Sequence, residues 1–374
     1  MSAFTKAANR VLGWTIGVVL GAGFLVGYLA AYVPPDVVWW MDPLAVLLPV
    51  TGSLLLVVVT GYWLTGRRRA GRGALAATVA VLVALRVAPD FGIGAGDRAA
   101  SSATDTTEAL RVMTFNTPYV GGDPGELGDA VADAVRAEGP HLLALQEPHV
   151  LTGRQTDGVR HVSPQLRRLL GADGYDLPAE LPFGSRVHQP VLSRQGADAL
   201  TSRRLERPSE GEFVSRVPFR WRGRRAVLYN VHLHTTVGGN KPWESTRFRA
   251  FDPEFWLPVV ETYRTGARRR AEQARELRRM IERETDPVIV VGDFNSTQHH
   301  WVYRHISGSL TDAHRAAGSG FGWTFPAHRP LVRIDHVLVS EAWEVVQTHV
   351  SSHHATSDHR PVVARLRWSD EASQ

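Results

Sequence analysis

Residues 287–295 read PVIVVGDFN, an almost continuous run of β-branched residues that ends abruptly in polar ones. A short apolar run bounded by turn residues predicts a fully buried strand. Gly292 closes this run, and Asp293 and Asn295 follow it directly. Because functional side chains gather at strand ends in α/β folds, the stretch predicts a buried strand that delivers a carboxylate and an amide to a site.

Polar side chains follow apolar runs at several other points along the chain. Five strand-terminal segments share this feature: Asn116, Glu147, Asn230 with His232, Asp293 with Asn295, and Asp335 with Ser357-Asp358-His359. Taken singly, an Asn or Asp after a strand is commonly a turn residue and a lone His is commonly structural. Together they supply carboxylates for a hard cation, amides for phosphate oxygens and imidazoles for proton transfer. The set therefore predicts one catalytic site.

Strands outnumber helices in the predicted C-terminal domain. The pattern predicts strands at 111–117, 142–146, 212–221, 225–235, 287–291, 333–339, 343–350 and 362–368, and helices at 125–137 and 267–284. Hairpins coexist with helical crossovers and no internal repeat is visible. We therefore expect an α/β (α+β) sandwich.

The segments FNT, LQEP, NVHLH, GDFN, RIDHVLVS and SDHRPV occur in that order between residues 115 and 362. In this order they resemble the endonuclease/exonuclease/phosphatase superfamily, and the resemblance covers essentially all of residues 109–369. GDFN followed some sixty residues later by SDHRPV is its most specific part. The resemblance implies a four-layer αββα sandwich with the site at one edge.

Metal binding is implied by the same resemblance. Glu147 matches the principal metal-ligating carboxylate, Asn116 lies nearby in the pattern, and Asp358 matches a further ligand on the metal or phosphate side. Carboxylate-rich sites favour Mg²⁺ or Mn²⁺, which keep several waters. We expect Mg²⁺, or alternatively Mn²⁺, as the cofactor.

The catalytic roles implied by the resemblance describe in-line attack of water on phosphorus. Asp293 matches the residue that positions and deprotonates the water, and Asn295 holds the water or the phosphate. His359 matches the histidine that contacts the scissile phosphate, and Asp335 is placed to orient it. The second imidazole and the supporting amide are His232 and Asn230.

The first 91 residues are predicted to anchor the chain in a membrane. The stretch 11–33 is apolar and uncharged, and about 20 such residues cross a bilayer as a helix. A cleavable signal peptide is the alternative, but a second apolar run, 43–66, follows closely. A third, 74–91, is interrupted by Arg86 and Asp90. Residues 92–108 are small and polar and predict a flexible linker before the catalytic domain, and 370–374 form a tail.

Charge asymmetry predicts which side of the membrane holds the domain. Lys6 and Arg10 precede the first span, an arginine cluster at 67–72 follows the second, and the loop 34–42 carries only acids. Basic segments stay inside, so three spans deliver the domain to the extracytoplasmic side of a plasma membrane. If the third segment instead lies on the surface, the domain stays cytoplasmic.

Composition limits the chemistry. The chain has no cysteine, which excludes disulfides, thiolate zinc sites and cysteine nucleophiles. The net charge of +5 and the pI of about 9.8 suit an anionic partner such as nucleic acid, phospholipid or cell-wall phosphate. Part of this excess charge belongs to the arginine cluster, which we interpret as a topology signal.

The insertion 235–266 carries six aromatic residues among basic ones. One interpretation is a mobile lip that meets a lipid-linked or aromatic substrate beside the bilayer. The other, which we favour, is a packed helical insertion whose aromatic side chains belong to the core.

Three functions remain open from the sequence. The first is an envelope phosphatase or phosphodiesterase acting on a lipid-linked phosphate or pyrophosphate. For this function the chain resembles the three-span, membrane-anchored branch of the superfamily, the glycopeptide (vancomycin/teicoplanin) resistance membrane proteins. The second is an anchored endo- or exonuclease, which needs a basic groove for nucleic acid. The third is a non-catalytic membrane scaffold that retains the fold. The predicted anchor and outward topology favour the first.

Overall fold

Two six-stranded sheets form the body of the molecule in a computed structural model, which describes residues 3–64, 79–84, 109–118, 124–147, 171–176, 189–194, 197–199, 213–235, 253–354 and 357–369. The first sheet has the order β11 (Trp343–Val350), β12 (Val362–Trp368), β1 (Leu110–Asn116), β2 (Leu142–Gln146), β4 (Val191–Arg194) and β3 (Tyr175–Asp176). The second has the order β5 (Ala197–Ala199), β6 (Val214–Trp221), β7 (Arg224–His232), β8 (Val288–Asp293), β10 (Asp335–Val339) and β9 (Thr311–Asp312).

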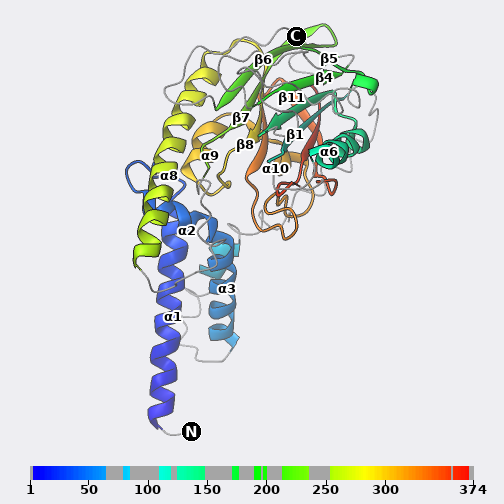
Figure 1. Cartoon of the computed structure of the whole chain (residues 1–374). Helices are drawn as coiled ribbons and strands as arrows, with labels where there is room; N and C mark the ends of the chain where they lie inside the picture. The colour runs from blue at the N-terminus through cyan, green and yellow to red at the C-terminus, as the bar shows by residue number, and fades with distance from the viewer. Residues whose placement is uncertain are drawn as a thin grey trace.

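The sheets pack face to face, with helices on both outer faces (Figure 1). Buried side chains of β1 and β2 meet those of β6, β7, β8 and β10 in one core cluster between the sheets. Helix α6 (Pro124–Glu138) packs on the outer face of the first sheet. Helices α8 (Pro253–Glu282) and α9 (Trp301–Ser307) cover the second. The short helix α10 (Ala313–Ala317) follows β9. The predicted mixed α/β two-sheet sandwich is confirmed.

The strand register brings the polar strand ends to one edge. Strands β1 and β2 are parallel, and Asn116 pairs with Gln146 at their carboxyl ends. In the second sheet β7 runs parallel to β8, and His232 pairs with Asp293. Strand β10 runs antiparallel to β8, so Asp335 at its start also lies opposite Asp293. Gly292 is required here, because a Cβ at this position would overlap the carbonyl oxygen of Val231.

Helix α8 begins well before the predicted residue 267 and takes in the end of the insertion. Two residues that disfavour helices, Pro258 and Gly266, lie inside it. Gly266 instead permits close packing, since a Cβ there would lie 2.8 Å from the carbonyl oxygen of Thr235. Trp256 on α8 is 40% exposed, whereas Tyr263 is hydrogen-bonded within the structure. The insertion's residues 236–252 lie outside the described part of the chain.

The N-terminal apolar segments are helical where they are described. They form α1 (Ala3–Leu29), the short helices η1 (Trp39–Met41) and α2 (Asp42–Val46), and α3 (Leu48–Leu64). The predicted second span, 43–66, is therefore broken at Leu47, because Pro49 lacks the backbone N–H that a continuous helix needs. Among the described residues no single helix is long and apolar enough to cross a bilayer. A pair bent by 63°, Trp39–Val46 with Leu48–Gly61, passes by length and composition, and Thr15–Leu29 is a shorter apolar helix.

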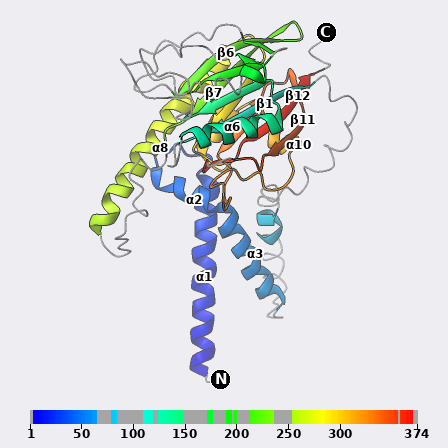
Figure 2. The same ribbon diagram turned by 45° about the vertical axis from the view of Figure 1, so that its right-hand side comes forward.

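These helices project together from one end of the sandwich (Figures 1 and 2). Residues 79–84, the described part of the third predicted segment, are also helical. Val79 and Val83 pack against Leu55 of α3 and against Leu20 and Phe24 of α1. The three apolar segments therefore lie side by side. The remainder of 74–91 and the predicted linker lie outside the described residues.

Candidate active site

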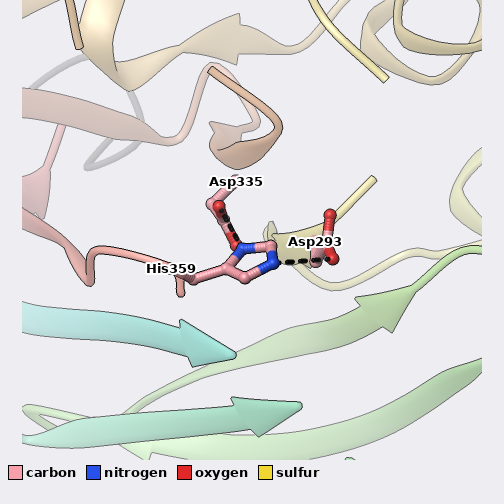
Figure 3. A group of neighbouring side chains, drawn as sticks. All are labelled: Asp293, Asp335 and His359. Atoms are coloured by element: carbon pink, nitrogen blue, oxygen red, sulfur yellow. Dashed lines mark hydrogen bonds and ion pairs between the residues drawn. The ribbon is translucent and has the colours of Figure 1, made fainter. Parts of the chain in front are cut away.

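His359 lies between two buried carboxylates at the strand-end edge (Figure 3). Its Nδ1 is 3.0 Å from Oδ2 of Asp335, and its Nε2 is 3.9 Å from Oδ2 of Asp293. Asp293 and Asp335 are each 1% exposed. The His359 main chain is fixed as well, because its N–H donates to Oγ of Ser357 at 2.9 Å. The predicted orientation of His359 by Asp335 matches this geometry.

Burial and charge give these groups unusual protonation behaviour. Burial raises the pKa of Asp293. Burial also disfavours the charged form of His359, but the carboxylates of Asp335 and Asp293 outweigh it and raise the pKa of the imidazole. The raised pKa favours the imidazolium form of His359. By spacing, one ligand atom from each of these three side chains could also surround an ion.

Two amides hold the Asp293 carboxylate. Asn116 Nδ2 donates to Oδ2 at 3.0 Å from the other sheet. The Asn295 backbone N–H donates to Oδ1 at 2.7 Å, and its Nδ2 lies 3.2 Å from Oδ2. Asn295 has φ of +47°, a left-handed conformation that asparagine tolerates better than most residues. The Asp293 carboxylate is thus fixed by contacts from both sheets.

The second imidazole faces a second carboxylate. His232 Nε2 is 3.4 Å from Oε1 of Glu147 and 3.8 Å from Oδ2 of Asp293. Glu147 has φ of +45°, which is costly for a residue with a long side chain and is typical of functional positions. The backbone turn after β2 therefore directs Glu147 toward the edge where His232 and Asp293 meet.

The predicted metal ligands fit a hard divalent cation. Asn116 and Asp358 each keep one buried side-chain oxygen that accepts no hydrogen bond from the described residues. Oxygen atoms of this kind, with the Glu147 carboxylate, are the ligands that Mg²⁺ and Mn²⁺ prefer. Ser357 links the segments, since its hydroxyl donates to the Asn116 carbonyl oxygen at 2.7 Å.

Asn230 lies at the junction of the two sheets. Its Nδ2 donates to the carbonyl oxygens of Leu145 at 3.0 Å and Pro190 at 3.1 Å, and its Oδ1 accepts from Gln146 Nε2 at 2.5 Å. These bonds support β2 immediately before Glu147, so the described contacts of Asn230 are structural. Its predicted catalytic role stays a prediction.

Several supporting residues were missed from sequence. Gln146 reads as one more strand residue, yet it bonds across the sheets to Asn230. Thr324 accepts from the Asp335 backbone N–H at 3.3 Å, and the Phe325 ring lies 4.9 Å from that of His359. Neither belongs to a segment that stood out. Tyr175, an aromatic residue of the first sheet, donates to the Pro140 carbonyl oxygen at 2.7 Å and takes no part in these contacts.

Solved structures with a similar fold have low sequence identity to this chain. An endonuclease/exonuclease/phosphatase family protein from Bacteroides thetaiotaomicron is 19% identical with a TM-score of 0.49, covering 70% of this chain and 96% of that one. A mannosyl-6-phosphatase from the same organism is 17% identical with a TM-score of 0.45 (69% and 100% covered). The human Nocturnin catalytic domain is 17% identical with a TM-score of 0.46 (70% and 95% covered).

Comparisons of the sequence itself identify the family. No curated protein matches this chain. The model of the Endonuclease/Exonuclease/phosphatase family matches residues 113–359, well over half of the 374 residues, and spans every segment that contributes a side chain to the site. The chain therefore belongs to the endonuclease/exonuclease/phosphatase family of phosphoester hydrolases.

Proposed function

We propose that this protein is a membrane-anchored, divalent-metal-dependent phosphoesterase that hydrolyses a phosphate ester or pyrophosphate of a lipid-linked envelope substrate. The observation that carries the proposal is the buried arrangement Asp293–His359–Asp335 beside the oxygens of Asn116, Glu147 and Asp358. A base and an imidazolium lie on one side, and the ligands for a cation lie next to them.

The contacts suggest a separate role for the cation, for Asp293 and for His359. When bound by Glu147, Asn116 and Asp358, a divalent cation would neutralise phosphate charge and polarise the scissile bond. Asp293, whose carboxylate is fixed by two amide groups and whose pKa is raised by burial, accepts a proton from the attacking water. His359 donates hydrogen bonds to the phosphate, and its charge is maintained by Asp335.

Exposed apolar surface supports the membrane anchor. The outward-facing side chains of α1 and α3 are large and apolar, among them Val18, Val19, Val50 and Val57. Apolar patches on this scale are rare on water-exposed helices and are stable in a bilayer. The side-by-side packing of 79–84 with α1 and α3 supports a third apolar segment of the same anchor.

The position of the site supports a lipid-linked substrate. His300, seven residues beyond Asp293 and buried, lies 3.8 Å from Asp42 in the chain between α1 and α3. The catalytic domain thus meets the segment between α1 and α3 at a residue close in sequence to Asp293, and the apolar helices project from that end of the sandwich (Figure 2). On α8 the large apolar side chains of Trp256, Leu257 and Val260 are exposed as well. A headgroup at the bilayer surface would have a short path to the site.

For localisation we propose a multi-pass plasma-membrane protein with an extracytoplasmic catalytic domain. The support remains the charge pattern, because basic segments flank the apolar ones on one side and the loop between the first two carries acids.

The full chain in lipid nanodiscs tests the function. Hydrolysis is measured with Mg²⁺, with Mn²⁺ and with chelator on isoprenyl pyrophosphate, phospholipid, plasmid DNA and a chromogenic phosphodiester, with Asp293→Asn as the background control. We expect metal-dependent release from the lipid-linked substrates and intact DNA. Nicked DNA with untouched lipids would instead establish the nuclease, and no metal-dependent turnover on any substrate would support the scaffold.

A further inference from the structure

A buried ion pair joins the apolar helices to the catalytic domain. Asp42 follows η1, in the segment between α1 and α3, and Arg270 lies on α8, 228 residues later. Arg270 Nη2 donates to Asp42 Oδ2 at 2.9 Å, and the side chains are 1% and 4% exposed. Tyr263 on α8 donates to the same oxygen at 2.9 Å, and His300 Nε2 lies 3.8 Å from Oδ1. One carboxylate of the anchor therefore has three partners in the catalytic domain.

A second, half-exposed set of contacts lies beside the first. Arg275 Nη2 donates to both oxygens of Asp36, at 2.8 and 3.0 Å. The Arg304 guanidinium lies 4.2 Å from the ring centre of Tyr32. These residues extend the contact across the whole segment 30–47, which we call the docking loop.

Buried charge makes this contact obligatory rather than incidental. A buried ion pair adds little net stability, but removal of one partner leaves an uncompensated charge away from water. Arg270 also donates from Nη1 to the His234 carbonyl oxygen at 3.3 Å, just past the end of the strand that carries His232. The catalytic domain therefore relies on Asp42 to neutralise a guanidinium that it buries next to its own active-site strand.

We infer that the docking loop and the catalytic domain form one docked unit, held by Asp42–Arg270 and Asp36–Arg275, and that the chain crosses the membrane an even number of times between Asp42 and the catalytic domain. The second half rests on the proposed membrane anchor. Two groups in contact at 2.9 Å lie on the same side of a bilayer.

This conclusion decides the role of the third apolar segment. In the proposed anchor, α3 leads away from the docking loop and provides one crossing, so a second crossing must return the chain. The segment 74–91 is the remaining apolar stretch, and its described part packs against α1 and α3. A surface-lying third segment would put Arg270 and Asp42 on opposite faces and break both ion pairs.

Docking is tested in the full chain with a protease site inserted at residues 97–103 and an affinity tag at the N-terminus. After cleavage in detergent, capture of the tagged anchor should retain the catalytic domain at 0.15 M salt. Asp42→Asn should weaken this retention by roughly a hundredfold, and Asp36→Asn by less because that pair is half exposed. Removal of both buried charges in Asp42→Asn/Arg270→Met should recover part of the loss.

Asp133→Asn is the matched control, since it removes an exposed carboxylate whose ion pair within the described residues is with Arg136 on α6, and it should change nothing. Release of the wild-type catalytic domain on cleavage, or retention by Asp42→Asn equal to that of wild type, would overturn the docked unit. Neither readout depends on hydrolysis, so a wrong substrate class leaves this test intact.

The crossing number is tested by sided labelling, which the cysteine-free chain makes simple. Single cysteines at Val37, Arg68 and Ala372 are exposed to a membrane-impermeant maleimide on intact cells. Val37→Cys and Ala372→Cys should both react with the maleimide, because both lie outside the cell. Arg68→Cys should not react, because it lies inside. Opposite labelling of Val37→Cys and Ala372→Cys would overturn the even crossing number, as would recovery of the uncleaved chain in the soluble fraction.

Discussion

Replacement of Asp335 by asparagine tests whether His359 acts as a cation. The pair Nδ1–Oδ2 is 3.0 Å apart and buried, and two unit charges at this distance interact by about 5 kcal/mol at an effective dielectric constant of 20. Asparagine keeps the shape and removes the charge. We expect kcat/KM to fall by about 10²- to 10⁴-fold, equivalent to about 3–5 kcal/mol of transition-state stabilisation.

The pH dependence separates this role from a structural one. A raised pKa keeps His359 cationic below that pKa, so activity of the wild type is lost as the pH rises through it. Without the Asp335 charge the loss should begin at lower pH. The assay is kcat/KM on a chromogenic phosphodiester from pH 5 to 10 with saturating Mg²⁺, with Asp133→Asn as control. The reasoning would be refuted if Asp335→Asn lowered kcat/KM by less than about threefold and left the pH at which activity is lost on the alkaline side unchanged.

Three further predictions concern stability, metal affinity and pH. Gly292→Ala should cost about 3–5 kcal/mol of unfolding free energy, because φ is +135° and the new Cβ would overlap Val231; a denaturation midpoint equal to that of wild type contradicts this. Glu147→Gln should raise the Mg²⁺ concentration for half-maximal activity at least about tenfold, and an unchanged metal titration would remove it from the ligand set. Burial, then the charges of Arg111 and Arg194, lower the pKa of His141 to about 4; the unfolded chain therefore takes up the proton first, and stability should decline as the pH falls from 6.5 toward 4. Urea denaturation of wild type and His141→Gln checks this, and equal slopes of stability against pH would count against it.

The strands that build the site could be predicted from sequence because each is a buried apolar run. Strands β1, β2, β8 and β12 lie within a residue or two of their predicted bounds. Polar residues directly after such runs reach the same edge because parallel strands share their carboxyl ends. Asp293 and His232 meet there for this reason, and Asp335 joins them because β10 runs antiparallel to β8 and starts at this edge.

Other features depend on contacts that no local pattern encodes. Helix α8 begins before the predicted residue 267, and Gly266 inside it packs closely against the Thr235 carbonyl oxygen. Short strands such as β3 and β9, two residues each, carry too little periodicity to detect. The burial of Asp42 follows only from Arg270, far along the chain, although local sequence suggested only an acidic loop.

The most direct test of the central claim is the metal-dependent hydrolysis rate of the full chain and of Asp293→Asn on a chromogenic phosphodiester. The asparagine keeps the space between Asn116 and Asn295 but cannot take the proton of water. We predict a rate that requires Mg²⁺ or Mn²⁺ in the wild type and falls by at least about a hundredfold in the variant, with an unchanged unfolding midpoint. A variant that turns over at nearly the wild-type rate, or a wild type whose rate is insensitive to chelator, would contradict the account.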